Sequence, residues 1–197
     1  MSCLIMLVLL LFLLVVASSD INQGQFSFNG YLNVEGVAGV DSSGLFTLTN
    51  TTSRIIGQIF YKNPIQFKNS TNATVSPFPT TFIFVIVPGY TDLGGHGLAF
   101  VISPNDEISG ALPTHYLGLF KETNIGLDSN HVVAIELGTA RTIAVGDIDG
   151  NHVSIDINSP RSVTAASAGY FTDESEFKNL NLKSGDPMQV WVEYDGV

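Results

Sequence analysis

The chain has 197 residues and a formal net charge of −10, with 19 glycines, 8 prolines and only 13% charged residues. This length favours one domain, and the low charge with frequent glycine favours a β-rich one. The excess of acidic residues argues against binding nucleic acid or an anionic membrane through bulk electrostatic attraction.

The chain begins with an apolar segment at residues 4–16, which is followed by the small residues Ala17 and Ser19. A membrane-spanning helix needs about 20 apolar residues, so this segment is short for one. We predict a cleaved signal peptide over residues 1–19, with an uncleaved anchor as the alternative. Because Cys3 is the only cysteine, the mature chain would have no disulfide.

Three acceptor sequons for N-glycosylation follow, at Asn50, Asn69 and Asn72. Three of them in a short polar region agree with passage through the secretory pathway. Asn69 and Asn72 are too close together for us to expect both to carry a glycan. The sequence therefore predicts a secreted glycoprotein.

Short apolar stretches separated by turn residues continue along the rest of the chain. They predict strands at Phe26–Phe28, Leu45–Leu48, Arg54–Tyr61, Ile65–Phe67, Thr81–Val87, Leu98–Ser103, Tyr116–Phe120, Val132–Leu137, His152–Asn158 and Met188–Tyr194. Thr81–Val87 is almost entirely apolar, which predicts a strand covered on both faces in the middle of a sheet. No segment after residue 20 has the apolar period of a long helix, so an all-β sandwich or barrel is the predicted fold class.

Two polar residues lie on predicted strands whose other residues are largely apolar. Glu136 alternates with the apolar residues of one strand and His152 begins the next, so both are predicted to point away from the core face. The connecting loop carries Asp147 and Asp149. Such a group could hold a divalent cation. The alternative is an ordinary hydrogen bond between Glu136 and His152, with solvated aspartates in a turn.

The glycine-rich turn Gly94–Gly97 places His96 directly before a predicted strand. A flexible turn that leads into a rigid strand is a common way to present a polar side chain to a ligand. His96 is therefore a candidate ligand-binding residue.

The residues around Glu136 do not favour an enzyme. Retaining glycoside hydrolysis needs two carboxyl groups about 5–5.5 Å apart, and no second acid accompanies Glu136 along its own strand. The chain also has no Gly-x-Ser-x-Gly motif and no cysteine after the leader. We therefore predict a non-enzymatic binding domain.

The order of several motifs resembles the plant legume-type (L-type) lectin domain, and most closely the extracellular domain of lectin receptor-like kinases. The motifs are GHGLAFVISP, YLGLF, VAIEL, GDIDGNHVSIDIN, SAGYF and VWVEYD, and the resemblance covers residues 21–195. It implies a concanavalin-like jelly-roll β-sandwich over residues 20–197, incomplete at its C-terminus because the last strands of the family are absent. It also implies a carbohydrate-binding domain that uses one calcium ion and one transition-metal ion, usually manganese.

The resemblance implies that Glu136, Asp147 and His152 are transition-metal ligands. The carboxylate that bridges both ions in the family is Gly138 here, and the asparagine that binds calcium is Thr142. Because calcium prefers about 6–8 oxygen ligands, we expect weak or no calcium binding. A loose site for a softer metal would remain.

The sugar-binding positions of the family are changed as well. His96 stands where the family has an aspartate that accepts hydrogen bonds from sugar hydroxyls, and Thr114 and His115 stand where it has two glycines. Ala140 replaces an aromatic residue that stacks on the sugar, and Thr142 replaces an asparagine. The resemblance thus implies a carbohydrate pocket whose polar groups differ from those of the family.

In the family, a cis peptide bond precedes that aspartate and is maintained by calcium-bound water. A cis bond before a residue other than proline costs about 3–4 kcal/mol and persists only where the surroundings enforce it. We therefore expect the bond between Gly95 and His96 to be trans.

These observations predict a lectin-type recognition domain with altered metal and sugar sites, whose partner is a glycan or another small extracellular ligand. The alternatives are a receptor-kinase-like ectodomain fragment that recognises an apolar molecule, a peptide or a nucleotide, and a domain without function. The predicted location is the apoplast, with membrane attachment only if a full-length protein carries a membrane helix, since no span follows the leader. Family members dimerise through one sheet, so a dimer is compatible with this prediction.

Overall fold

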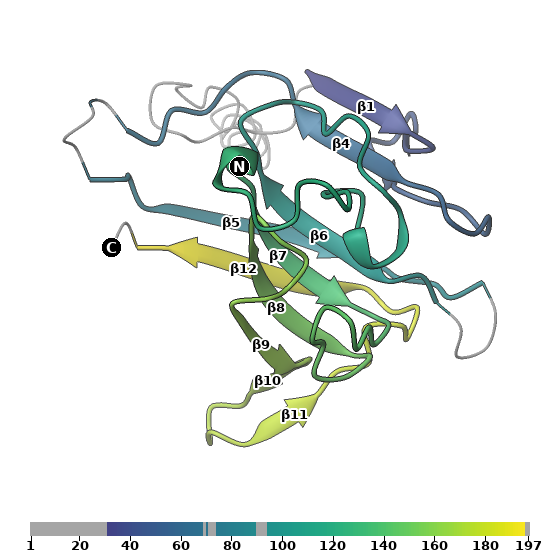
Figure 1. Cartoon of the computed structure of the whole chain (residues 1–197). Helices are drawn as coiled ribbons and strands as arrows, with labels where there is room; N and C mark the ends of the chain where they lie inside the picture. Colours follow the sequence, from purple (N-terminus) through teal and green to yellow (C-terminus); the bar gives the residue numbers. More distant parts are fainter. Residues whose placement is uncertain (1–30, 69, 71–73, 90–93, 196–197) are drawn as a thin grey trace, which may run out of the picture. The chain divides into compact units, whose positions relative to one another are not determined.

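The computed structural model describes residues 31–68, 70, 74–89 and 94–195. The predicted leader and the predicted strand Phe26–Phe28 lie outside these residues. The described chain consists of strands and short 3-10 helices, and none of its helices has the length and apolar composition that a membrane crossing needs. The elements are β1 (Leu32–Gly36), β2 (Gly39–Val40), β3 (Phe46–Thr47), β4 (Gly57–Tyr61), β5 (Phe78–Phe84), β6 (Gly97–Ile102), η2 (Thr114–Tyr116), η3 (Asp128–Asn130), β7 (Val133–Gly138), β8 (His152–Ile157), β9 (Thr164–Ser167), β10 (Gly169–Phe171), β11 (Phe177–Asn179) and β12 (Met188–Tyr194) (Figure 1).

The chain divides into two compact units. The larger unit contains residues 32–62 and 81–190. In the smaller unit, the ring of Phe78 lies 5.0 Å from that of Phe67 and 5.6 Å from that of Tyr194, measured between ring centroids. The candidate sugar-binding and metal-binding residues all lie in the larger unit.

An antiparallel sheet in the order β6–β7–β8–β9 is the main element of the larger unit (Figure 1). Gly97 of β6 lies opposite Gly138 of β7, which in turn lies opposite His152 of β8. Because side chains alternate between the faces of a strand, this register puts Glu136 and His152 on the same face. The register also brings the His96 turn, Gly138 and His152 to one end of the sheet.

The apolar face of this sheet packs against residues of β5 and β12. The buried residues of this core are Phe84, Leu137, Ala168 and Leu182, and Phe82, Ile86, Leu98, Val153, Met188 and Val190 pack around them. Burial of each large apolar side chain stabilises the fold by about 1.5–3 kcal/mol. The hydroxyl of Thr81 donates a hydrogen bond of 3.0 Å to the carbonyl oxygen of Val190, which ties β5 to β12.

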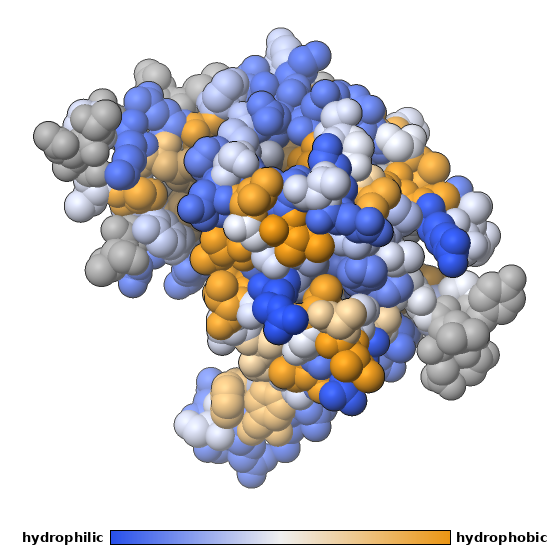
Figure 2. All heavy atoms as spheres, viewed as in Figure 1, coloured by the Kyte–Doolittle hydropathy of each residue, from blue (hydrophilic) through white to orange (hydrophobic). Residues whose placement is uncertain are grey.

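The polar face of β8 is more deeply buried than its apolar face. His152 and Asp156 are both 0% exposed, whereas Ile155 and Ile157 are 37% and 46% exposed. The prediction that Glu136 and His152 lie on the face opposite the apolar residues is correct. That face is nevertheless buried on its own side of the sheet, whereas some apolar side chains of the larger unit reach the surface (Figure 2).

The polar face is buried because the segment after β6 folds back over it. Leu119 and Phe120, 3% and 1% exposed, pack with Ala134 of β7 in a second apolar cluster. Ala99 and Val101 of β6 contact the same cluster. The sheet is thus covered on both sides near Glu136, although the residues there are partly polar.

The predicted strand Tyr116–Phe120 is wrong. The chain there forms η2 and then turns at Leu117 and Gly118, whose φ angles are 52° and 71°. Strand residues have negative φ, so these two residues reverse the chain. The reversal places Leu119 over the sheet instead of beside a neighbouring strand.

The prediction that Thr81–Val87 is covered on both faces is also wrong for the described residues. The strand β5 pairs with β12, and its Phe84 faces the core. On the other side Ile83, Val85 and Val87 are 67%, 47% and 73% exposed. An apolar run therefore does not identify a covered strand by itself.

The remaining strand predictions have mixed outcomes. Leu98–Ser103, Val132–Leu137, His152–Asn158 and Met188–Tyr194 correspond to β6, β7, β8 and β12 within one or two residues. β3 and β4 occupy only part of the stretches predicted for them, and no strand forms at Ile65–Phe67. The sequence interpretation did not include β1, β2, β9, β10 or β11.

Two substitutions on β5 test this description of its faces. We expect Phe84→Ala to lower the free energy of unfolding by about 3–5 kcal/mol, because it leaves a cavity in the core. Ile83→Ala should lower it by less than about 1 kcal/mol, because that side chain is mostly exposed. Urea denaturation of both variants measures the difference, and equally large losses would contradict a strand with one exposed face.

Candidate functional site

The buried polar face carries two carboxyl groups joined through a serine. The hydroxyl of Ser154 lies 3.1 Å from Oε2 of Glu136 and 3.4 Å from Oδ1 of Asp156, within hydrogen-bonding distance of both. Oδ2 of Asp156 has no hydrogen-bond partner among the described residues. The sequence interpretation missed Asp156, although its alternation with His152 and Ser154 on β8 could have identified it.

Burial and the neighbouring charge of Asp156 raise the pKa of Glu136 to about 8. Burial likewise raises the pKa of Asp156. Both effects disfavour the ionised form, so Glu136 holds a proton at neutral pH. Both acids are deeply buried, 6% and 0% exposed, so neither presents its carboxyl group to a polysaccharide at the surface.

His152 presents an unpaired nitrogen to Glu136. Its Nδ1 lies 2.8 Å from the carbonyl oxygen of Asp149, which can only accept, so Nδ1 carries the proton and donates. Nε2, the other ring nitrogen, has no hydrogen-bond partner among the described residues. It lies 3.8 Å from Oε1 of Glu136. The structure thus brings together two of the three predicted transition-metal ligands.

Gly138 makes room for the imidazole of His152. A Cβ atom at residue 138 would overlap the ring, with Nε2 and Cε1 among the nearest atoms. An aspartate at this position and His152 in its present rotamer therefore exclude one another. Glycine at position 138, in place of the carboxylate of the family, therefore has a direct structural consequence. The imidazole ring of His152 fills the space that a side chain at position 138 would take.

Asp147, the third predicted metal ligand, closes the loop after β7. Its Oδ2 accepts a hydrogen bond of 2.6 Å from the backbone N–H of Thr142, and its carbonyl oxygen accepts one of 3.2 Å from Nε of Arg141. Among the described residues, no three His, Cys, Asp or Glu side chains are arranged to hold a metal ion. The ligand atoms that are present fit a calcium ion poorly. Gly138 offers no side-chain oxygen, and Oδ2 of Asp147 already accepts a hydrogen bond from the backbone N–H of Thr142.

The His96 turn is fixed to the end of β7 through Thr139. The backbone N–H of Thr139 donates a hydrogen bond of 2.9 Å to the carbonyl oxygen of His96, and its hydroxyl donates one of 2.8 Å to that of Gly95. Thr139 is 2% exposed, so this anchor is shielded from water. No peptide bond in the described ranges is cis, which confirms the predicted trans bond between Gly95 and His96.

Two histidines come together at this end of the sheet. The ring centroids of His96 and His115 are 6.5 Å apart, and that of Tyr116 lies 4.1 Å from His115. Burial and, next, the charge of His115 lower the pKa of His96, while Asp147 acts in the opposite direction. His96 is therefore neutral at neutral pH and offers one donor and one acceptor.

The other candidate sugar-binding residues offer less chemistry. Ala140 is half-buried and presents only a methyl group. Thr114 lies at the start of η2, with its hydroxyl 3.4 Å from Nδ1 of His115. The backbone N–H of Thr142 is bound to Asp147. The structure thus groups the two histidines and Thr114 at one place, with Ala140 and Thr142 on the loop that begins at Thr139.

Of the three predicted glycosylation sites, only Asn50 lies among the described residues. It is exposed, and its Oδ1 accepts a hydrogen bond of 2.8 Å from the backbone N–H of Thr52. Asn69 and Asn72 lie outside the described residues.

The raised pKa of Glu136 predicts a dependence of stability on pH. The folded state keeps a proton on Glu136 up to about pH 8, whereas the unfolded chain releases it near the ordinary value of 4.5. Glu136 therefore stabilises the fold most at low pH, and its contribution falls as pH rises from about 4.5 to about 8. Urea denaturation in EDTA measures the free energy of unfolding at the two ends of this range. Between the lower and the higher pH, this free energy should fall less for Glu136→Gln than for the unmodified chain. An equal loss in both proteins would be inconsistent with a buried, protonated Glu136.

Comparisons with known proteins agree with the all-β architecture. The family model described as "Legume lectin domain" matches residues 22–197. The L-type lectin-domain containing receptor kinase V.9 of Arabidopsis thaliana is 47% identical over 98% of this chain and 29% of that protein. The chain spans less than a third of the length of the curated relatives it matches.

Solved structures of plant lectins show the same fold. The Lotus tetragonolobus seed lectin is 22% identical, with a TM-score of 0.69 over 87% of this chain and 70% of that one. The Bauhinia forficata lectin, solved in complex with GalNAc, is 27% identical, with a TM-score of 0.68 over 88% of this chain and 71% of that one. The fold is therefore the predicted jelly-roll β-sandwich. The chain belongs to the legume lectin domain family, whose members are non-enzymatic carbohydrate-binding domains and typically bind calcium and manganese.

Proposed function

We propose that this chain is a carbohydrate-recognition domain that binds glycan beside His96 and His115 and does so without the calcium site of its family. The observation that carries the proposal is the pair of histidine rings 6.5 Å apart at the end of β6. They stand at positions that the sequence resemblance associates with sugar contact. Family membership supports the ligand class, and the altered residues support the difference in chemistry.

The groups at this place suit hydroxyl-rich ligands. Neutral His96 can donate one hydrogen bond to a sugar hydroxyl and accept another. The hydroxyl of Thr114 adds a second donor and acceptor close to His115. The adjoining rings of His115 and Tyr116 offer apolar surface to the C–H groups of a sugar ring. Recognition of this kind needs no bound calcium.

The metal chemistry of the proposed site differs from that of the family. Nε2 of His152 and Oε1 of Glu136 are two possible metal ligands 3.8 Å apart, and the imidazole nitrogen suits a transition-metal ion better than calcium. Asp147 supplies a third ligand if its bond to Thr142 opens. Calcium needs about 6–8 oxygen ligands, and this group has too few.

We also propose that the domain acts outside the cell as a non-enzymatic receptor module. Residues 1–19 would serve as a cleaved signal peptide and Asn50 as a glycosylated surface residue. The similarity to receptor kinases supports an extracellular recognition role. The carboxyl pair of Glu136 and Asp156 is buried, which supports binding without hydrolysis.

A glycan array tests the binding proposal. The secreted protein is applied with calcium and again with EDTA, and we expect the same glycans to be bound in both conditions. Binding that disappears with EDTA would show that recognition depends on metal. Absence of binding in both conditions, with binding of apolar molecules, peptides or nucleotides in separate titrations, would favour a non-sugar ligand.

Histidine substitutions locate the binding. His96→Ala and His115→Ala should each weaken binding of the best array glycan by about tenfold, as expected when a hydrogen bond to a ligand is lost. His131→Ala is the matched control, because His131 is exposed and follows η3, next to the opposite end of β7. Affinities from isothermal titration that fall equally in all three variants would contradict the proposed location.

Thermal unfolding tests the metal proposal separately. We expect calcium to leave the Tm of the unmodified protein unchanged, because a ligand raises Tm only when it binds the folded state. Any increase produced by manganese should be absent in His152→Gln. A rise of several degrees with calcium would contradict the proposed loss of the calcium site.

A further inference from the structure

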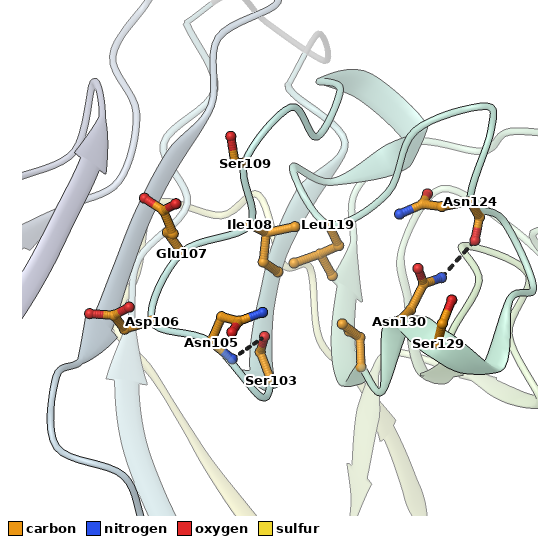
Figure 3. A pocket seen from close by; sticks show the side chains of 11 residues that line it. Ser103, Asn105, Asp106, Glu107, Ile108, Ser109, Leu119, Asn124, Ser129 and Asn130 are labelled. Carbon is orange, nitrogen blue, oxygen red and sulfur yellow. Dashed lines mark hydrogen bonds between the residues drawn. The ribbon is translucent and has the colours of Figure 1, made fainter.

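A second hollow lies at the far end of the sheet from His96. Strand β6 runs for five residue steps from Gly97 to Ile102, which is about 17 Å. Beyond Ile102, residues 103 and 105–109 line one part of a cavity of about 520 Å³, and residues 119, 124, 129, 130 and 132 line the rest (Figure 3). This volume is within the range of about 300–1,000 Å³ that is usual for ligand-binding pockets.

The cavity has two polar walls of different chemistry. Asp106 and Glu107 extend from one side, and Asn124, Ser129 and Asn130 lie on the other (Figure 3). No lysine or arginine is among the described residues that line it. One wall is therefore anionic, and the other offers amide and hydroxyl groups.

An apolar surface separates the two walls. Ile108 and Leu119 lie between them in Figure 3, and Val132 also lines the cavity. Leu119 and Val132 are 3% and 4% exposed, and both belong to the buried cluster above β7. Ile108 packs against this cluster and is only partly buried, so its side chain can receive the C–H face of a ring-shaped ligand.

The acidic wall is anchored to the β1–β4 hairpin. Nδ2 of Asn33 donates a hydrogen bond of 2.8 Å to the carbonyl oxygen of Asp106. Oε1 of Gln58 accepts one of 3.3 Å from the backbone N–H of Ile108. These bonds use the backbone of the wall and do not engage the carboxylates of Asp106 and Glu107, which line the cavity on this side.

The amide wall is anchored to the end of β8. Nδ2 of Asn130 donates hydrogen bonds to the carbonyl oxygens of Asn124 and Asn158, at 2.6 Å and 3.0 Å. Oδ1 of Asn158 accepts one of 2.9 Å from the backbone N–H of Val132. Long-range bonds therefore hold both walls in place, as a preorganised binding site requires.

We propose that this cavity is a second saccharide site, specific for oligosaccharides of amino sugars that carry a free ammonium group. The carboxylates of Asp106 and Glu107 bind the ammonium group through charge-assisted hydrogen bonds. Asn124, Ser129 and Asn130 bind the sugar hydroxyls, and the apolar surface receives the C–H face of the ring. Closely spaced polar groups on two walls match a polyol better than a peptide, because a polyol offers several neighbouring hydroxyl groups and a peptide backbone offers none.

Isothermal titration with a glucosamine oligomer, in EDTA and at a mildly acidic pH, tests this site. We expect the double variant Asp106→Asn/Glu107→Gln to bind about tenfold more weakly, because it loses both charged acceptors. Asp173→Asn/Glu174→Gln is the matched control, since it removes the same adjacent acid pair from the exposed β10–β11 turn. This control should bind like the unmodified protein.

Further measurements separate this site from the His96 site and from general attraction to an acidic protein. Ser129→Leu, which blocks the opposite wall without changing charge, should also bind about tenfold more weakly. His96→Ala should bind the glucosamine oligomer as tightly as the unmodified protein does. The N-acetylated oligomer should bind at least about tenfold more weakly than the free amine.

Four results would overturn the proposal. The first is that the unmodified protein does not bind the glucosamine oligomer, and the second is that the two acid-pair variants lose affinity for it equally. The third is that the acetylated oligomer binds as tightly as the free amine. The fourth is that His96→Ala loses binding of the glucosamine oligomer while Asp106→Asn/Glu107→Gln binds it normally. The last result would assign the amino sugar to the His96 site. It would leave the proposed glycan recognition there intact.

Discussion

The register between β6, β7 and β8 determines where Glu136, His152 and the His96 turn lie. Gly97, Gly138 and His152 stand in one row across the three strands. This row brings the His96 turn beside the end of β7, where Thr139 fixes it with two hydrogen bonds. A shift of one residue would move every side chain of a strand to the other face. Glu136 and His152 would then no longer meet.

The buried polar face is the energetic consequence of this register. Unpaired polar atoms in an interior cost free energy, and Nε2 of His152 and Oδ2 of Asp156 both lack partners among the described residues. Protonation of Glu136 removes one negative charge from the group. Gly138 admits the imidazole where a side chain would exclude it. The face also keeps the two side chains that we propose as metal ligands close together, with Nε2 of His152 3.8 Å from Oε1 of Glu136.

The sequence predicted more of the fold than of the site. The alternation on β6, β7 and β8, the pairing of Glu136 with His152, and the lectin family all followed from residue pattern and motif order. The burial of their shared face did not, because it depends on a distant segment that turns at Leu117 and covers it. Residue pattern alone did not place His96 beside His115, although the family resemblance assigned both residues to sugar-binding positions.

The central claim is that glycan binds beside His96 and His115 without calcium. The most direct measurement is an NMR titration of isotope-labelled protein in EDTA with a glycan bound on the array. The account predicts that the backbone amide signals of His96, His115 and Thr139 shift together and saturate with one affinity. Saturable shifts confined to other parts of the protein, or shifts at these residues only after calcium is added, would contradict it.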